Sequence, residues 1–186
     1  QYDLSDQLKD NAQVSIITIQ SEQGLEIMRH TLTAQVLARA IKNLYPKSKL
    51  AIGPTIEDGF YYDVESEEVI SSDDLIKIED EMKNIIKTKS LLTKKLVSKS
   101  EALKIFKEKK EPFKETIINE SNQKNDFQLY YQDNEEFVDL CRGPHLPNLG
   151  FIGSFKLTKV SGADWKGESK HTMLTRIYGT AFNSDK

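Results

Sequence analysis

One amphipathic segment, residues 25–44, constrains the fold more than any other feature of the chain. Its apolar side chains recur at helical spacing: Leu25, Met28, Leu32, Val36, Leu37, Ala40, Ile41 and Leu44. Ser21 can cap this helix, and Tyr45-Pro46 should end it, because proline disfavours helical geometry in the residue before it. A helix with one apolar stripe must bury that stripe against another element, so a sheet or a second helix has to cover it.

The rest of the chain supplies the elements that can cover this helix. Further helices are expected from Ser72 through Ile86 and from Ser98 or Ser100 to about Lys109, with Pro112 marking the end of the latter. Strands are expected at 11–20, on both sides of the Asp58-Gly59 turn within 49–65, and at 91–98, 127–132, 137–140, 151–160 and 173–182. Helices and strands mix without regular alternation, which predicts an α+β fold with a mainly antiparallel sheet.

Composition sets the broad class of protein. The chain has 186 residues, 30 % charged and 38 % hydrophobic, with a net charge of −3. These values predict a soluble globular domain with a core of its own. No apolar run approaches the roughly 18–20 residues that a membrane span needs, so no membrane partner is expected. The single cysteine cannot form an internal disulfide, which is compatible with the cytoplasm.

The stretch FVDLCRGPHLPN, residues 137–148, places that cysteine four residues before one of three histidines. Between them, Gly143-Pro144 favours a turn that lets the Cys141 thiol and the His145 imidazole point into the same space. Such a pair can bind zinc, or it can act as a nucleophile with its base. It can also be a buried thiol beside a loop histidine, and the spacing alone leaves all three readings open.

His30 lies on the amphipathic helix without a partner at the usual spacing. Side chains four residues apart share a helix face, but the residue four after His30 is Ala34. Gln35 is one residue further, about 140° away around the helix. His30 and Gln35 therefore do not share a face unless a π-bulge absorbs one residue, whereas Thr31 and Gln35 do.

Several motifs, taken in order along the chain, resemble one family. They are RH and TA in 29–34, AIKNLYP, AIGPTIEDGFYYD, FVDLCRGPHLPN, FKLTKVSGADWKG and MLTRIYGTAF. Their order and spacing resemble bacterial-type threonyl-tRNA synthetase, in its second N-terminal domain, the editing domain. The resemblance implies an α+β fold of the threonyl/alanyl-tRNA synthetase second additional domain type, with a mainly antiparallel sheet and a long helix in a cleft. It implies three parts: 1–20 as the tail of a preceding ubiquitin-like domain, 21–182 as the editing domain, and 183–186 as the start of a linker to the catalytic core.

The resemblance also implies an activity and a set of site residues. Editing domains of this family hydrolyse serine wrongly esterified to threonine tRNA, because a pocket that accepts threonine rejects serine by only about 1–3 kcal/mol. The family's catalytic residues match His30, Lys114, Cys141 and His145. Residues matching its substrate-binding positions are Asp139, Gly53 and Tyr62, and Gln35 stands where the family has a second helix histidine.

The departure at Gln35 is the main difference from the family pattern. The family carries His-x-x-x-His on this helix, whereas here one residue is inserted. Register kept from Arg29 forward pairs His30 with Ala34, and register kept from Ala40 backward pairs Thr31 with Gln35. Glutamine cannot act as a base at neutral pH. We therefore expect weakened editing, and a catalytically inactive domain that only docks tRNA is the alternative.

The expected partners and cofactors follow from the same resemblance. The partners are the 3′ end of threonine tRNA mischarged with serine and the remainder of the synthetase, in the cytoplasm. No cofactor is expected for editing, and ATP and zinc are expected only in the catalytic core. Related alanyl editing domains bind zinc through two such motifs, and this chain offers only His30, Cys141 and His145, so a zinc-dependent hydrolase is a third reading. His171 has no motif support and is expected at the surface.

Overall fold

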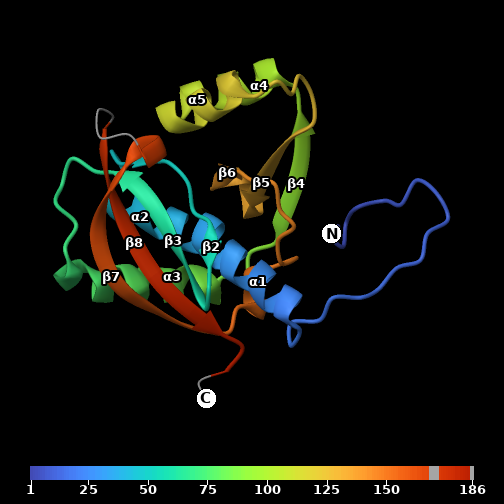
Figure 1. Ribbon diagram of the computed structural model, residues 1–186, viewed down its shortest axis with the longest axis horizontal. Helices are drawn as coiled ribbons and strands as arrows, with labels where there is room; N and C mark the ends of the chain where they lie inside the picture. The colour runs from blue at the N-terminus through green and yellow to red at the C-terminus, as the bar shows by residue number, and fades with distance from the viewer. Residues whose placement is uncertain (168–171, 185–186) are drawn as a thin grey trace.

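Two antiparallel sheets flank a long helix in a computed structural model that describes residues 1–167 and 172–184 (Figure 1). The helix contacts β3 of the larger sheet, β6 of the smaller sheet and helix α3. All strand pairs of the described residues are antiparallel. The predicted α+β class with a mainly antiparallel sheet is confirmed.

The long helix is continuous but changes type in its middle. It comprises α1 (Glu22–Thr31), a π-helical segment η1 (Leu32–Leu37) and α2 (Ala38–Leu44). Ser21 caps it as predicted, its hydroxyl accepting a hydrogen bond from the Gly24 N–H at 3.0 Å. A π-helical turn takes up one extra residue, so the apolar stripe remains buried on both sides of it. Met28, Leu32, Val36, Leu37, Ala40 and Ile41 are all fully buried.

The larger sheet has the strand order β1-β3-β8-β7, with β2 paired to β3. Its strands are β1 (Lys49–Leu50), β2 (Thr55–Ile56), β3 (Gly59–Glu65), β7 (Ser154–Asp164) and β8 (Met173–Phe182). The predicted hairpin is present between β2 and β3, and Asp58 in its turn has a φ of 56°. Left-handed geometry at this position is typical of the Asp-Gly turn.

Helix α3 (Leu75–Lys87) packs beside the long helix and β7. The 3₁₀ turn η2 (Ser72–Asp74) precedes it, and Ser71 and Asp74 form a reciprocal capping box there. Short 3₁₀ turns also occur at η3 (Asp133–Glu135), η4 (Leu149–Phe151) and η5 (Trp165–Gly167).

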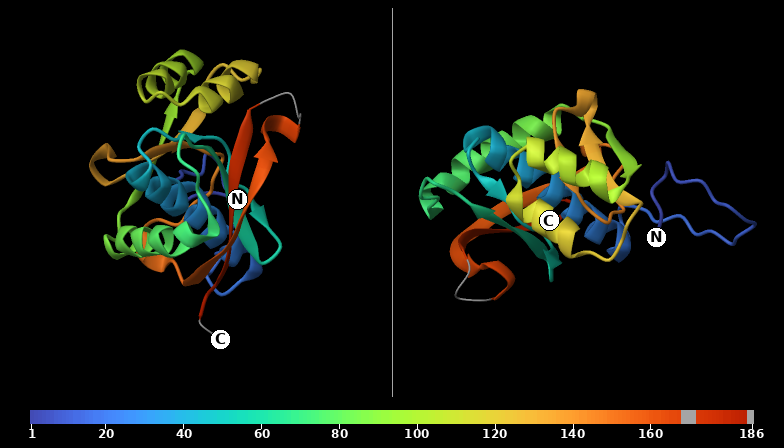
Figure 2. Two further views of the ribbon diagram at one scale, coloured as in Figure 1. Left: turned by 90° about the vertical axis from the view of Figure 1, so that its left-hand side faces the viewer. Right: turned by 90° about the horizontal axis from the view of Figure 1, so that it is seen from above.

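The smaller sheet has the order β4-β5-β6, from β4 (Leu92–Val97), β5 (Phe127–Gln132) and β6 (Val138–Leu140). Helices α4 (Lys99–Glu108) and α5 (Pro112–Glu120) cover it, on the side away from α3 (Figure 2). A separate apolar cluster fills this layer: Ala102, Phe106, Ile118, Phe127, Leu129 and Val138. Each large side chain buried there contributes about 1.5–3 kcal/mol relative to exposure.

Two sequence expectations about elements are wrong, and one helix was not expected. Residues 11–20 form no strand: the structure describes no partner strand beside them, and Val14 and Ile16 are exposed. Helix α4 ends before Pro112, as predicted, but α5 was not expected: Pro112 also begins that helix, because proline suits the first helical position, where no N–H donor is needed. The strand expected from Phe151 begins at Ser154. The assignment of 1–20 to a preceding domain stays a prediction.

No helix of the described residues is both long enough and apolar enough to span a membrane.

Candidate functional site

A cleft of about 940 Å³ opens between the long helix, the 52–54 loop, α5 and the end of β6. Predicted site residues on its wall are His30, Gly53, Lys114, Asp139 and Cys141. Ala34, Ile52, Pro54, Ile117, Leu140 and Arg142 also line it. Segments more than a hundred residues apart in the sequence thus meet at one surface.

A buried ion pair forms the floor of this cleft. Lys114 Nζ on α5 lies 2.9 Å from Asp139 Oδ1 on β6, and both side chains are at most 4 % exposed. The Tyr62 hydroxyl donates to the other carboxylate oxygen at 3.3 Å. Burial, followed by the Asp139 charge, raises the pKa of Tyr62 well above its usual range, so this phenol remains a donor. The ion pair holds one cation and one anion at fixed positions, with both side chains almost fully shielded from solvent.

The Cys141 thiol faces His30 rather than open solvent. Cys141 Sγ lies 3.1 Å from His30 Nε2 and accepts a longer contact, 3.4 Å, from the Gly143 N–H. Burial raises the pKa of Cys141 to about 12, because a thiolate is costly to desolvate. Burial also lowers the pKa of His30, although the carboxylates of Asp139 and Glu26 oppose that shift. Near neutral pH the site therefore holds a thiol and a neutral imidazole, not a reactive thiolate.

His145 lies behind His30, outside the cleft lining, with the two ring centroids 4.7 Å apart. It is 6 % exposed, and its Nδ1 lies 2.9 Å from the Thr31 hydroxyl. Its backbone N–H donates to Asp3 Oδ1 at 2.9 Å, and the Tyr130 ring meets the imidazole edge-on at 4.5 Å. Burial, followed by the neighbouring His30, lowers the pKa of His145 well below its usual range.

Gly53 sets the shape of the wall opposite the ion pair. A β-carbon at this position would lie 2.2 Å from Cδ2 of Tyr62 and 2.9 Å from the Thr33 hydroxyl. The absence of a side chain lets the loop backbone approach the Tyr62 ring and keeps the cleft open at this point.

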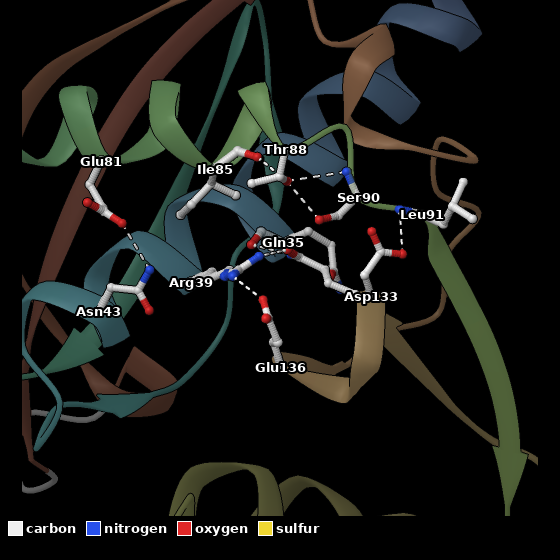
Figure 3. Close-up of polar contacts among 11 residues, drawn as sticks. Gln35, Arg39, Asn43, Glu81, Ile85, Thr88, Ser90, Leu91, Asp133 and Glu136 are labelled. Atoms are coloured by element: carbon white, nitrogen blue, oxygen red, sulfur yellow. Dashed lines mark hydrogen bonds and ion pairs between the residues drawn. The ribbon is translucent and has the colours of Figure 1, made fainter.

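Gln35 faces away from the cleft. It is fully buried, and Gln132 Nε2 donates both to its carbonyl at 3.0 Å and to its Oε1 at 3.1 Å. Arg39, one turn later, donates to Gln132 Oε1 and pairs with Glu136 (Figure 3). The helix therefore keeps the register that pairs His30 with Ala34, and the π-helical segment returns the following residues to the core.

The structure thus gathers most of the residues proposed from the sequence. His30, Gly53, Lys114, Asp139 and Cys141 line the cleft, Tyr62 and His145 stand directly behind its wall, and Gln35 lies elsewhere. Sequence reasoning missed Thr31, Tyr130 and Asp3 as neighbours of His145. The sequence offered one signal for Thr31: it is a threonine inside a helix, next to His30. The hydroxyl of such a threonine can form a hydrogen bond to a group outside its own helix.

His30, Cys141 and His145 can also be considered as metal ligands, because their donor atoms lie within 4.8 Å of one another. Imidazole and thiol are donor types that zinc prefers, and three such ligands leave one position open. The expectation that no cofactor is needed stays a prediction. His171, expected at the surface, lies outside the described residues.

Lowering the pH from about 7.5 to about 5.5 should destabilise the chain. The folded protein lowers the pKa of both His30 and His145, so the unfolded chain binds more protons as pH falls below 6.5. Each histidine should cost up to about 1.4 kcal/mol of unfolding free energy over this range. Urea titrations at both pH values measure the loss. His145→Asn should show a smaller loss, and an equal loss would contradict the burial argument.

The chain is similar in sequence to threonyl-tRNA synthetases. Residues 128–178 match the family model described as threonyl and alanyl tRNA synthetase second additional domain. The chain is 49 % identical over 184 residues to threonine–tRNA ligase 2 of Bacillus subtilis (strain 168). It is 50 % identical over 184 residues to a threonine–tRNA ligase of Desulfatibacillum aliphaticivorans, and 45 % identical over 185 residues to that of Prochlorococcus marinus (strain MIT 9515).

These alignments cover 99–100 % of the chain but only 28 % of each relative. The match to the family model falls on β5, β6, the 141–148 loop and most of β7 and β8, which include the Cys141 side of the cleft. The chain is therefore homologous over its whole length to part of threonyl-tRNA synthetases, and its residues 128–178 match the second additional domain.

Proposed function

We propose that this chain hydrolyses serine wrongly esterified to the 3′ end of threonine tRNA, as the editing domain of a threonine–tRNA ligase. The observation that carries the proposal is the convergence of His30, Lys114, Asp139 and Cys141 on one cleft of about 940 Å³. The relatives are named threonine–tRNA ligases, which supports the choice of tRNA. The rest of the ligase and the tRNA are then the partners, in the cytoplasm.

The reaction is an attack of water on the ester carbonyl carbon. The bond between that carbon and the ribose oxygen breaks, and serine and a free tRNA end are released. A proton leaves the water, and a proton reaches the departing ribose oxygen. The enzyme must supply a proton acceptor for the water and donors for the oxyanion that forms.

The chemistry of the cleft suits water better than a covalent nucleophile. The high pKa of Cys141 keeps the thiol protonated, whereas the lowered pKa of His30 keeps its imidazole neutral and able to accept a proton. We assign the proton-accepting role to His30. Lys114 holds the water and the developing oxyanion, and Asp139 receives the substrate amino group.

We also propose that this activity is weaker than in relatives with two helix histidines. Ala34 lies on the cleft wall one turn after His30, so no imidazole is present at that position. The Gln35 side chain is hydrogen-bonded to Gln132. One proton-accepting group is thus missing from the helix side of the cleft. A domain that only docks tRNA is the alternative.

Deacylation of seryl-tRNA by the chain, alone and within its parent enzyme, tests the proposal. We expect slow hydrolysis above the spontaneous rate, with threonyl-tRNA spared, and a decrease of about 10²-fold or more in His30→Ala. Deleting Thr33 and changing Gln35 to histidine should raise the rate, because the helix then regains two histidines one turn apart.

Each other outcome decides between the readings. Hydrolysis as fast as in a relative with both helix histidines, abolished by His145→Ala, would refute weakened editing. No hydrolysis by the chain or its parent would favour the docking domain. Loss of activity on chelation, restored by zinc, would favour the zinc-dependent hydrolase over a metal-free site.

A further inference from the structure

The Thr31 hydroxyl is surrounded by three polar neighbours and is fully buried. Its oxygen lies 2.9 Å from the Ile27 carbonyl, one turn earlier on α1. The Leu146 N–H donates to it at 3.1 Å, and His145 Nδ1 lies 2.9 Å away. The helix that carries His30 is thereby joined to the loop that carries His145 through a single hydroxyl group.

The one hydrogen and two lone pairs of the Thr31 hydroxyl determine which of its three neighbours donates and which accepts. A hydroxyl has one hydrogen to donate and two lone pairs that accept. The Leu146 N–H can only donate, and it takes one lone pair. The Ile27 carbonyl can only accept, so it takes the hydrogen. His145 Nδ1 must then donate to the remaining lone pair, which places the ring proton on Nδ1.

The other ring nitrogen supports the same assignment. His145 Nε2 is buried and has no hydrogen-bond partner among the described residues. An unpartnered buried lone pair is tolerated more often than an unpartnered N–H donor, so a bare Nε2 is the less costly state. Which nitrogen carries the proton is set by the hydrogen bond that the other one makes.

We propose that Thr31 is a positioning residue that holds neutral His145 as its Nδ1–H tautomer and so makes Nε2 the only proton-accepting atom of that ring. Asp3 fixes the backbone of the same residue, and the Tyr130 ring edge limits the rotation of the imidazole. The ring is therefore held in both position and tautomer before any substrate arrives.

The tautomer has a consequence that rests on the proposed function. His145 stands directly behind His30, with its ring 4.7 Å from the His30 ring, and His30 contacts the cleft. His145 Nε2, which has no hydrogen-bond partner among the described residues, is then the one ring atom that can accept a hydrogen bond. Without a hydrogen on Nε2, His145 cannot donate a hydrogen bond to the Cys141 sulfur through that atom.

Nitrogen NMR of the histidine-labelled chain tests the tautomer directly, without any substrate. The three histidines are assigned by single substitutions, and long-range proton–nitrogen spectra distinguish protonated from bare ring nitrogens. We expect His145 to show a protonated Nδ1 and a bare Nε2 near neutral pH. Thr31→Ser should preserve this pattern, and Thr31→Val should shift the proton, at least in part, to Nε2.

Thr116→Val is the matched control, since the Thr116 hydroxyl also bonds the carbonyl four residues earlier, Pro112 at 3.0 Å, but is exposed on α5. It should leave the His145 spectrum unchanged. A wild-type His145 protonated on Nε2 would overturn the proposal, as would an unchanged Nδ1–H pattern in Thr31→Val. If Thr31→Val does not fold, the smaller Thr31→Ala carries the same comparison, and the wild-type spectrum still decides the tautomer.

Deacylation provides the second measurement. Thr31→Val should lower kcat for seryl-tRNA about 10²-fold with little change in KM, and Thr31→Ser should restore most of it, because positioning losses affect the chemical step. An unchanged kcat with a shifted tautomer would refute the positioning role. A chain with the expected tautomer but no hydrolysis, even as wild type, would refute the proposed function and leave the tautomer assignment standing.

Discussion

Lys114→Met should lower the free energy of unfolding by about 3–5 kcal/mol, a large fraction of the stability of a domain of this size. The substitution keeps most of the side-chain volume but leaves the Asp139 carboxylate in a buried site without its cation. Equilibrium unfolding in urea measures the loss. Removing both charges, in Lys114→Met with Asp139→Leu, should recover a substantial part of it, because no unpaired charge then remains.

The control for this prediction is Lys95→Met. Lys95 also pairs with a carboxylate, Glu135, but both side chains are about half exposed or more. Ion pairs that water already solvates contribute little, so this variant should unfold close to the wild type. Equal destabilisation by the two substitutions would show that burial does not govern the Lys114–Asp139 pair.

Gly53→Ala should decrease seryl-tRNA hydrolysis about 10²-fold while costing about 1–3 kcal/mol of stability. The new methyl group would lie 2.2 Å from the Tyr62 ring, so the ring or the loop must move. Either movement disturbs the Tyr62 hydroxyl that bonds Asp139, and with it the floor of the cleft. Single-turnover deacylation and urea unfolding measure the two effects separately.

Gly162→Ala in β7 provides the comparison, because its new methyl would meet Met173 Sδ at 3.4 Å, near ordinary contact distance. It should alter neither hydrolysis nor stability by a comparable amount. If Gly53→Ala behaves like Gly162→Ala, the close approach of the 52–54 loop to Tyr62 is not required for the reaction.

Much of this fold is predictable from local pattern. The apolar repeat of 25–44, the Ser21 cap and the Asp58-Gly59 turn each act over a few residues, and all three appear as expected. The strand expected at 11–20 fails because a strand exists only with a partner. Its β-branched residues carry no information on whether a partner is beside them.

The candidate site also has contacts that local motifs predict and contacts that only the tertiary fold creates. The motifs identified Cys141 and His145 as neighbours across a turn, but the role of Thr31 depends on Leu146, which reaches it from 115 residues away. The burial that keeps Cys141 a thiol comes from the surrounding fold, and no local spacing reports it. Pro112 was ambiguous for another reason: the same residue can follow one helix and begin the next.

The π-helical segment Leu32–Leu37 is a local irregularity in an otherwise α-helical element. A single added residue in a regular α-helix would rotate everything after it by about 100° and expose its apolar face. Here six π-helical residues take up the extra residue, and the α-helical residues on either side keep their apolar face toward the core. The α-helical residues on both sides of this segment, such as Met28 and Ile41, therefore remain fully buried in the core. Such a segment lets a long buried helix carry an added residue in its middle without rebuilding the domain around it.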